Sequence, residues 1–121
     1  PQSGEAIFSA EDLTRLQAAR SGVEVDSRLA DYAVDLVEAT RSGAWANPLR
    51  LGASPRATQA LLVMAQAKAL MSGRGFVVPE DIQKVAPAVL SHRLVPDETL
   101  GWSTADLADH IRVILDQVPV P

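Results

Sequence analysis

The sequence predicts a mainly α-helical domain, a small bundle of about five helices with a minor short β element. Two observations lead to this class. Helix-start signals followed by apolar residues at helical spacing recur along the whole chain. Aromatic residues make up only 4% of the 121 residues, so alanine, leucine and valine must build the core. Alanine and leucine are strong helix formers, which favours helix packing over a sheet.

The first two helices are predicted from their N-terminal caps. Ser9 followed by Asp12 resembles a capping box, and the short helix behind it should end near Arg20. Asp26 is a good N-cap for a second helix, which should end near Arg41-Ser42-Gly43, because glycine readily takes the left-handed conformation of a helix C-terminus. The core face of this second helix is predicted to comprise Leu29, Tyr32, Ala33, Leu36 and Val37.

The third helix has the clearest start in the sequence and follows a predicted loop over residues 44–51. Ser54 is the predicted N-cap, and Pro55 occupies the first helical position, where its missing N–H costs nothing. Gly73 should end this helix. One apolar face is predicted to point into the core, comprising Ala57, Ala60, Leu61, Met64, Ala67 and Met71.

Two further helices are predicted in the second half of the chain. Pro79 and Glu80-Asp81 open a fourth helix, because proline suits the first helical position and negative charge is favourable at a helix N-terminus. Pro87 removes one backbone hydrogen bond within it and should bend or split the helix. The last helix begins at Ser103.

Three short segments are predicted to be extended, at residues 23–25, 76–78 and 92–95. The first two each precede a helix start, so their local patterns echo each other. They could pair as a small ribbon on the helical body.

The composition excludes several classes of function. The net charge is −4 and the basic residues are scattered, whereas a domain that mainly binds nucleic acid is usually basic along one face. No apolar run approaches the ~20 residues of a membrane helix, so no membrane partner is expected. The absence of cysteine excludes a disulfide scaffold and fits a cytoplasmic location. The chain begins with Pro1 rather than Met, and we expect it to be a piece of a longer protein.

No complete catalytic or metal site is evident in the sequence. The phosphate-loop pattern G-x-x-x-x-G-K-[ST] is missing, and no pattern holds a nucleophile next to a base. His92 and His110 lie in different segments without metal-ligand spacing. This fragment alone is therefore expected to have no catalytic machinery, no metal and no bound cofactor.

The residue that stands out is Arg56, at the second position of the third helix. A helix N-terminus carries unpaired N–H groups and a partial positive charge, and arginine adds a rigid, permanently charged fork that suits phosphate oxygens. A cation is locally unfavourable there, which favours a functional role. The small residues Gly52 and Ala53 would let another domain or a ligand approach closely. Spacing alone leaves open that Arg56 simply points into water.

The segment around Arg56 resembles the sensor-2 motif of MoxR-type AAA+ ATPases, and it reads Gly52-Ala53-Ser54-Pro55-Arg56-Ala57. Other segments resemble signatures of this family in the expected order, at residues 39–41, 73–82, 86–94 and 118–121. The resemblance covers nearly the whole chain from Ser9 onward. One mild departure is Val78, where the family has Ser or Thr.

The resemblance implies that residues 9–121 form the C-terminal helical lid of such an ATPase, and that residues 1–8 are the linker from its core. In the family the core supplies the phosphate loop, the magnesium-binding acid and the sensor-1 residue. ATP and magnesium are therefore expected in the full-length protein. Arg56 is expected to reach the γ-phosphate as sensor 2, with Ser54 and Pro55 positioning it.

The resemblance also implies partners. The lid is expected to contact its own core and neighbouring subunits of a ring, commonly a hexamer. Hydrolysis would be coupled to chaperone-like remodelling or assembly of a client, and the resemblance implies a von Willebrand factor A domain protein as a partner. Arg41, Arg74 and Arg93 also match family positions, where capping a helix end or pairing with an acid is the favoured interpretation. The alternative function is an independent helical protein-interaction module with no nucleotide role.

Overall fold

The computed structural model describes residues 9–121, so the predicted linker over residues 1–8 lies outside the described residues. As predicted, the described part contains five α-helices, namely α1 (Ala10–Ser21), α2 (Ser27–Ala39), α3 (Arg56–Met71), α4 (Pro79–Ser91) and α5 (Thr104–Gln117). Two 3₁₀ turns, η1 (Ala44–Ala46) and η2 (Glu98–Leu100), and two strands, β1 (Leu49–Leu51) and β2 (Val95–Pro96), lie in the connections. No helix in this part is long and apolar enough to cross a membrane.

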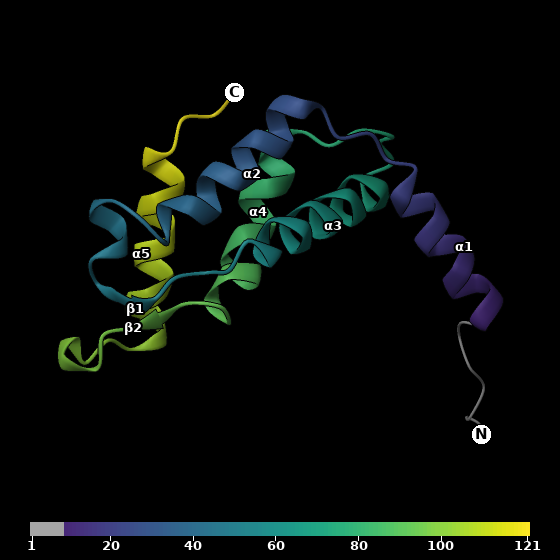
Figure 1. The fold of residues 1–121 in the computed structure, drawn as a ribbon. Helices are drawn as coiled ribbons and strands as arrows, with labels where there is room; N and C mark the ends of the chain where they lie inside the picture. Colours follow the sequence, from purple (N-terminus) through teal and green to yellow (C-terminus); the bar gives the residue numbers. More distant parts are fainter. Residues whose placement is uncertain (1–8) are drawn as a thin grey trace, which may run out of the picture.

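Helix α3 is the central element of the fold. It packs against α1, α2 and α4, and α4 in turn packs against α5 (Figure 1). Helix α1 extends from one end of this body and contributes no buried residue. Two hydrogen bonds tie its end to α3, because Arg20 Nη1 donates to Gln66 Oε1 at 3.0 Å and Gln66 Nε2 donates to the Val23 carbonyl at 2.9 Å.

The core lies between α2, α3, α4 and α5, and the core face predicted for α2 is confirmed residue by residue. The face predicted for α3 is partly wrong. Its buried residues are Ala57, Leu61, Ala65 and Ala69. Met64 is 46% exposed and Met71 is 85% exposed, so neither is a core residue. The reason is that α3 is apolar on more than one side, so that periodicity did not select which side the neighbouring helices cover.

Three predicted N-caps are confirmed, whereas the predicted C-cap Gly43 and the predicted N-cap Ser54 are not. The side chains of Ser9, Asp26 and Ser103 each accept a backbone N–H at the start of α1, α2 and α5. Helix α2 ends earlier than predicted, at Ala39, and Gly43 with its φ of 80° precedes η1. Helix α3 has no side-chain cap, because its N-cap is Pro55 in helical geometry rather than Ser54.

The β element was predicted in kind but only partly in place, since β2 begins at Val95 within the predicted extended segment 92–95 whereas the predicted ribbon does not form. Residues 23–25 and 76–78 meet only in an isolated parallel bridge, where the Glu24 N–H donates to the Gly75 carbonyl and the Val77 N–H donates to the Glu24 carbonyl, both at 2.9 Å. The two-stranded antiparallel sheet of the described chain joins β1 to β2 instead. Residues 44–51 are therefore not simply a loop, since they contain η1 and β1. Helix α4 runs without a break through Pro87, so the predicted split is wrong.

Candidate functional site

The start of α3 is the point where the sequence placed the candidate site, and its electrostatics differ from those of the other helix starts. Each of the other four α-helices has an acidic residue at its N-cap or in its first turn, whereas α3 has neither. The Arg56 side chain is exposed on this turn. Its positive charge adds to the positive end of the helix dipole instead of compensating it. The start of α3 therefore carries positive charge that no acid in its own first turn compensates.

The backbone that leads into α3 is held by one buried threonine. Thr40, 1% exposed at the end of α2, accepts the Ala53 N–H at 3.0 Å through its hydroxyl oxygen and donates that hydroxyl to the Val37 carbonyl at 2.6 Å. Both buried polar groups are thereby satisfied. This contact fixes the position of the α3 start relative to α2, three residues before Arg56.

The sequence-based interpretation of Gly52 and Ala53 is corrected by this packing. Ala53 is fully buried, and a β-carbon at Gly52 would lie 2.8 Å from the carbonyl carbon of Thr40 and 3.1 Å from the Arg41 α-carbon. The chain that approaches these small residues is therefore the end of α2 in the same domain, not another domain or a ligand. Sequence reasoning did not identify Thr40, because a single threonine in the family-like segment 39–41 carries no spacing signal of its own.

Two further predicted arginines lie around the α3 start. Arg41 is exposed and its Nη1 donates to the Ala53 carbonyl at 3.4 Å, a long hydrogen bond that places it beside the segment before α3. Arg93 follows α4 in the chain. Val95, two residues after it, pairs with Leu51 in the β1–β2 sheet, and Leu51 lies five residues before Arg56. Helices α3 and α4 are consecutive and packed together, so the end of α4 lies by the start of α3 (Figure 1).

Two arginines differ from the others in having no side-chain hydrogen bond or ion pair within residues 9–121. Of the nine arginines in the sequence, seven have a hydrogen bond or ion pair from the side chain, namely Arg15, Arg20, Arg28, Arg41, Arg50, Arg74 and Arg112. Arg56 and Arg93 have none among the described residues, and both are exposed. The two cations without an internal partner therefore lie at the same end of the domain.

The comparison with known families decides what kind of domain this is. The AAA lid domain family matches residues 45–111, which is more than half of the chain. The chain belongs to the AAA lid domain family. The matched range begins in η1 and ends in α5, so it contains the α3 start and the segment around Arg93.

Relatives of this lid agree with the resemblance to MoxR-type ATPases. The chain is 35% identical over 118 residues to the protein YeaC of Bacillus subtilis, covering 97% of this chain and 36% of that protein. It is 38% identical over 104 residues to Chaperone MoxR1 of Mycobacterium tuberculosis, covering 78% of this chain and 27% of that protein. The chain therefore spans about a third of the length of such relatives.

A solved structure confirms the fold of the lid. The crystal structure of a putative ATPase from Cytophaga hutchinsonii superposes with a TM-score of 0.84 at 32% identity. The match covers 97% of this chain and 37% of that protein. The predicted resemblance to the lid of a MoxR-type AAA+ ATPase is thus confirmed in both sequence and fold.

Arg74, the third of the family-like arginines, has a structural role in the lid. Its two terminal nitrogens bind both carboxylate oxygens of Asp81 at 2.7 Å, and Asp81 also accepts the Val78 N–H at 2.9 Å. Asp81 is 2% exposed, and the Arg74 guanidinium holds the pKa of that carboxyl below its ordinary value. The pair joins the loop after α3 to the first turn of α4, as expected for an arginine that pairs with an acid.

His110 on α5 contacts two tryptophans that lie outside this helix, Trp45 and Trp102. Trp102 is half-buried against the core and stacks at a tilt on His110, with ring centroids 5.2 Å apart. His110 Nε2 lies 2.7 Å from the Trp45 carbonyl oxygen in η1. His110 is therefore engaged in tertiary packing.

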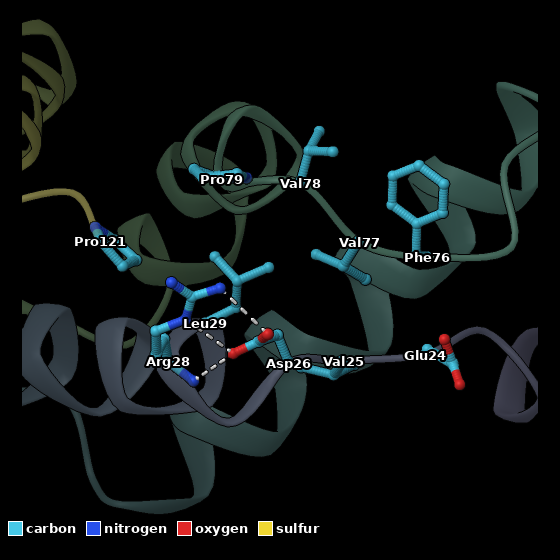
Figure 2. Close-up of a pocket in the computed structure, with 10 residues that line it drawn as sticks. All are labelled: Glu24, Val25, Asp26, Arg28, Leu29, Phe76, Val77, Val78, Pro79 and Pro121. Atoms are coloured by element: carbon cyan, nitrogen blue, oxygen red, sulfur yellow. Dashed lines mark hydrogen bonds and ion pairs between the residues drawn. The ribbon is translucent and has the colours of Figure 1, made fainter.

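A cavity of about 600 Å³ lies where α2 begins, between the two bridged segments and the chain end (Figure 2). Asp26 and Arg28 form an ion pair at its wall, with Arg28 lowering the pKa of the Asp26 carboxyl, and Pro121 also lines the cavity. Phe76 and Val77, which line this cavity, follow the C-terminal end of α3 in the chain. Arg56 is at the other end of this helix, which is about 24 Å long. The cavity is therefore separate from the candidate site.

Proposed function

We propose that this lid covers ATP bound by an ATPase core outside the present chain, and that Arg56 contacts the γ-phosphate as the sensor-2 residue. The observation that carries the proposal is the exposed Arg56 side chain on a helix start that lacks an acid. The family match supports it, because the matched range includes this segment.

The residues at the α3 start fit the phosphate end of a nucleotide. Pro55 has a φ of −55° and its ring fixes the turn from which Arg56 emerges, while the Ser54 carbonyl accepts the Ala57 N–H at 2.9 Å. The guanidinium supplies donors suited to phosphate oxygens. With no acid in this turn, magnesium ligands and the phosphate loop must come from the core.

Magnitudes explain why the lid requires the core. An exposed arginine–phosphate contact is worth roughly 0.2–1 kcal/mol by analogy with surface ion pairs. Millimolar affinity already requires about 4 kcal/mol. The isolated lid should therefore bind no ATP measurably. When the lid closes, exclusion of water strengthens the same contact, and arginine stabilisation of phosphoryl transfer can then be large.

We further propose that subunits of the full-length protein assemble into a cytoplasmic ring, commonly a hexamer, in which lid rotation couples hydrolysis to remodelling or assembly of a client protein. The Mycobacterium tuberculosis relative is named a chaperone, which supports this use of the ATPase cycle. A von Willebrand factor A domain protein is the proposed partner on the basis of the resemblance to MoxR-type ATPases.

The test is Arg56→Ala in the full-length protein, with ATPase rate and lid stability measured together. We expect hydrolysis to fall at least about tenfold, since removing one transition-state donor commonly costs a hundredfold or more, with no loss of stability. The matched control is Arg112→Ala, another exposed helical arginine, whose side-chain partner is Asp109 on its own helix. An unchanged rate would remove Arg56 from the mechanism and favour the interaction module.

A further inference from the structure

The outer side of α3 and α4 carries an apolar groove. It has a volume of about 590 Å³ and is lined by Ala60, Val63, Met64, Ala88, Val89, His92 and Arg93. Val63 is 40% exposed and Met64 is 46% exposed. Single exposed apolar side chains are ordinary on a protein surface, but these are contiguous and lie in a hollow.

The groove begins on the face of α3 that carries Arg56. Residues four apart on a helix lie on one face, so Ala60 follows Arg56 at a distance of one turn and Val63 follows in the next turn. A domain that contacts the Arg56 guanidinium would therefore also cover Ala60. The groove is continuous with the surface that the proposed function turns toward the nucleotide.

The rim of the groove is cationic and uncompensated. Arg93 is exposed, and in the described part of the chain no carboxylate lies within ion-pair distance of it. His92 lies next to it on the same rim. The full sequence has a net charge of −4, so a basic rim on an apolar hollow is a local exception. A complementary surface would present apolar side chains and a carboxylate.

We propose that this groove docks the ATPase core of the same polypeptide when the lid closes over nucleotide, with a core carboxylate pairing with Arg93. The inference rests on the proposed function, because it uses the orientation of Arg56 toward the core. Arg93 is a positioning residue in this scheme: it holds the closed lid and thereby places Arg56. Closure should then protect Met64 from solvent.

The test is the rate of maleimide labelling of a single cysteine in the full-length protein. These 121 residues contain no cysteine, so M64C introduces the lid's only thiol, with any cysteines of the preceding part replaced. V113C is the matched control, because Val113 is 45% exposed on α5 and Met64 is 46% exposed on α3. A non-hydrolysable ATP analogue with magnesium should slow labelling of M64C at least about fivefold and of V113C less than about twofold.

A second variant tests the basic rim. Adding Arg93→Glu to M64C should abolish the protection and raise the KM for ATP, whereas Arg93→Lys should retain both. If the analogue does not slow M64C labelling while Arg56→Ala still abolishes hydrolysis, the groove is not the docking site and the proposed function stands. Protection that disappears when the ring is diluted to monomers would assign the groove to a neighbouring subunit and overturn docking of the same chain's core.

Discussion

Gly52 and Thr40 are in backbone contact: a β-carbon at Gly52 would collide with the Thr40 carbonyl oxygen and lie 2.8 Å from its carbonyl carbon. The Ala53 N–H next in the chain donates to the Thr40 hydroxyl at 3.0 Å. The end of α2 and the segment before α3 are thereby joined at two adjacent residues. Arg56 follows this contact by three residues, so its base is held by the core of the lid rather than by a mobile loop.

Gly52→Ala should destabilise the lid, because the obstructing atoms belong to the backbone and cannot rotate away. We expect a loss of roughly 1–3 kcal/mol in the free energy of unfolding, the usual cost of overpacking. Urea denaturation followed by circular dichroism measures it. Gly75→Ala is the control, since a β-carbon there meets nothing within 4 Å. Equal stability of the two variants would show that α2 and α3 can separate at little cost.

Thr40→Val should also destabilise the lid, by leaving the buried Ala53 N–H without an acceptor. The expected loss is about 1–3 kcal/mol for an unsatisfied buried group, although the volume of the side chain hardly changes. Thr14→Val is a suitable comparison, because the Thr14 hydroxyl donates to the Ala10 carbonyl on exposed α1. That variant should change the free energy of unfolding by less than about 0.5 kcal/mol. A neutral Thr40→Val would contradict the role given to this hydroxyl.

The Arg74–Asp81 pair predicts an acid-sensitive component of stability. Arg74 lowers the pKa of Asp81 in the folded state, so the ionised carboxylate stabilises the fold above its unfolded pKa, near 3.9. This contribution is lost as pH falls through the lower, folded pKa. Between pH 5 and pH 3, Asp81→Asn should therefore reduce the acid-induced loss in the free energy of unfolding.

Urea titrations at several pH values would measure this dependence. Asp109→Asn serves as the control, because Asp109 and Arg112 form an ion pair whose side chains are both 71% exposed. Exposed pairs of this kind contribute little. If the wild-type protein and D81N lose the same free energy of unfolding between pH 5 and pH 3, the pair would not be a source of acid sensitivity.

The helices could be predicted from sequence because their signals are local. Serine and aspartate caps and the single apolar face of α2 specify start, direction and buried side without tertiary information. Helix α3 differs, since it packs against three helices and is apolar on several sides. Met64 therefore fitted a core pattern and yet lies 46% exposed in the groove. Which apolar side is covered depends on neighbours that the local pattern does not contain.

The candidate site was predictable only in part. Arg56 was identified from the residues as lying in the first turn of α3, although it is the first helical residue rather than the second, and its side chain is exposed. Strand β1 was missed because its alternation covers only three residues, too few for a strand signal, and its pairing with β2 is a long-range contact. For the same reason the proximity of Arg93 to the α3 start could not be read from spacing along the chain.

The most direct test of the central claim compares the affinities of full-length wild type and Arg56→Ala for ADP and for a non-hydrolysable ATP analogue. A charge-assisted contact to the γ-phosphate alone, worth about 1.5–3 kcal/mol, predicts that the variant binds the analogue roughly 10- to 100-fold more weakly. Its affinity for ADP should stay within about twofold, because ADP lacks that phosphate. Equal weakening for both nucleotides, or none for either, would contradict the assignment of Arg56 to the γ-phosphate.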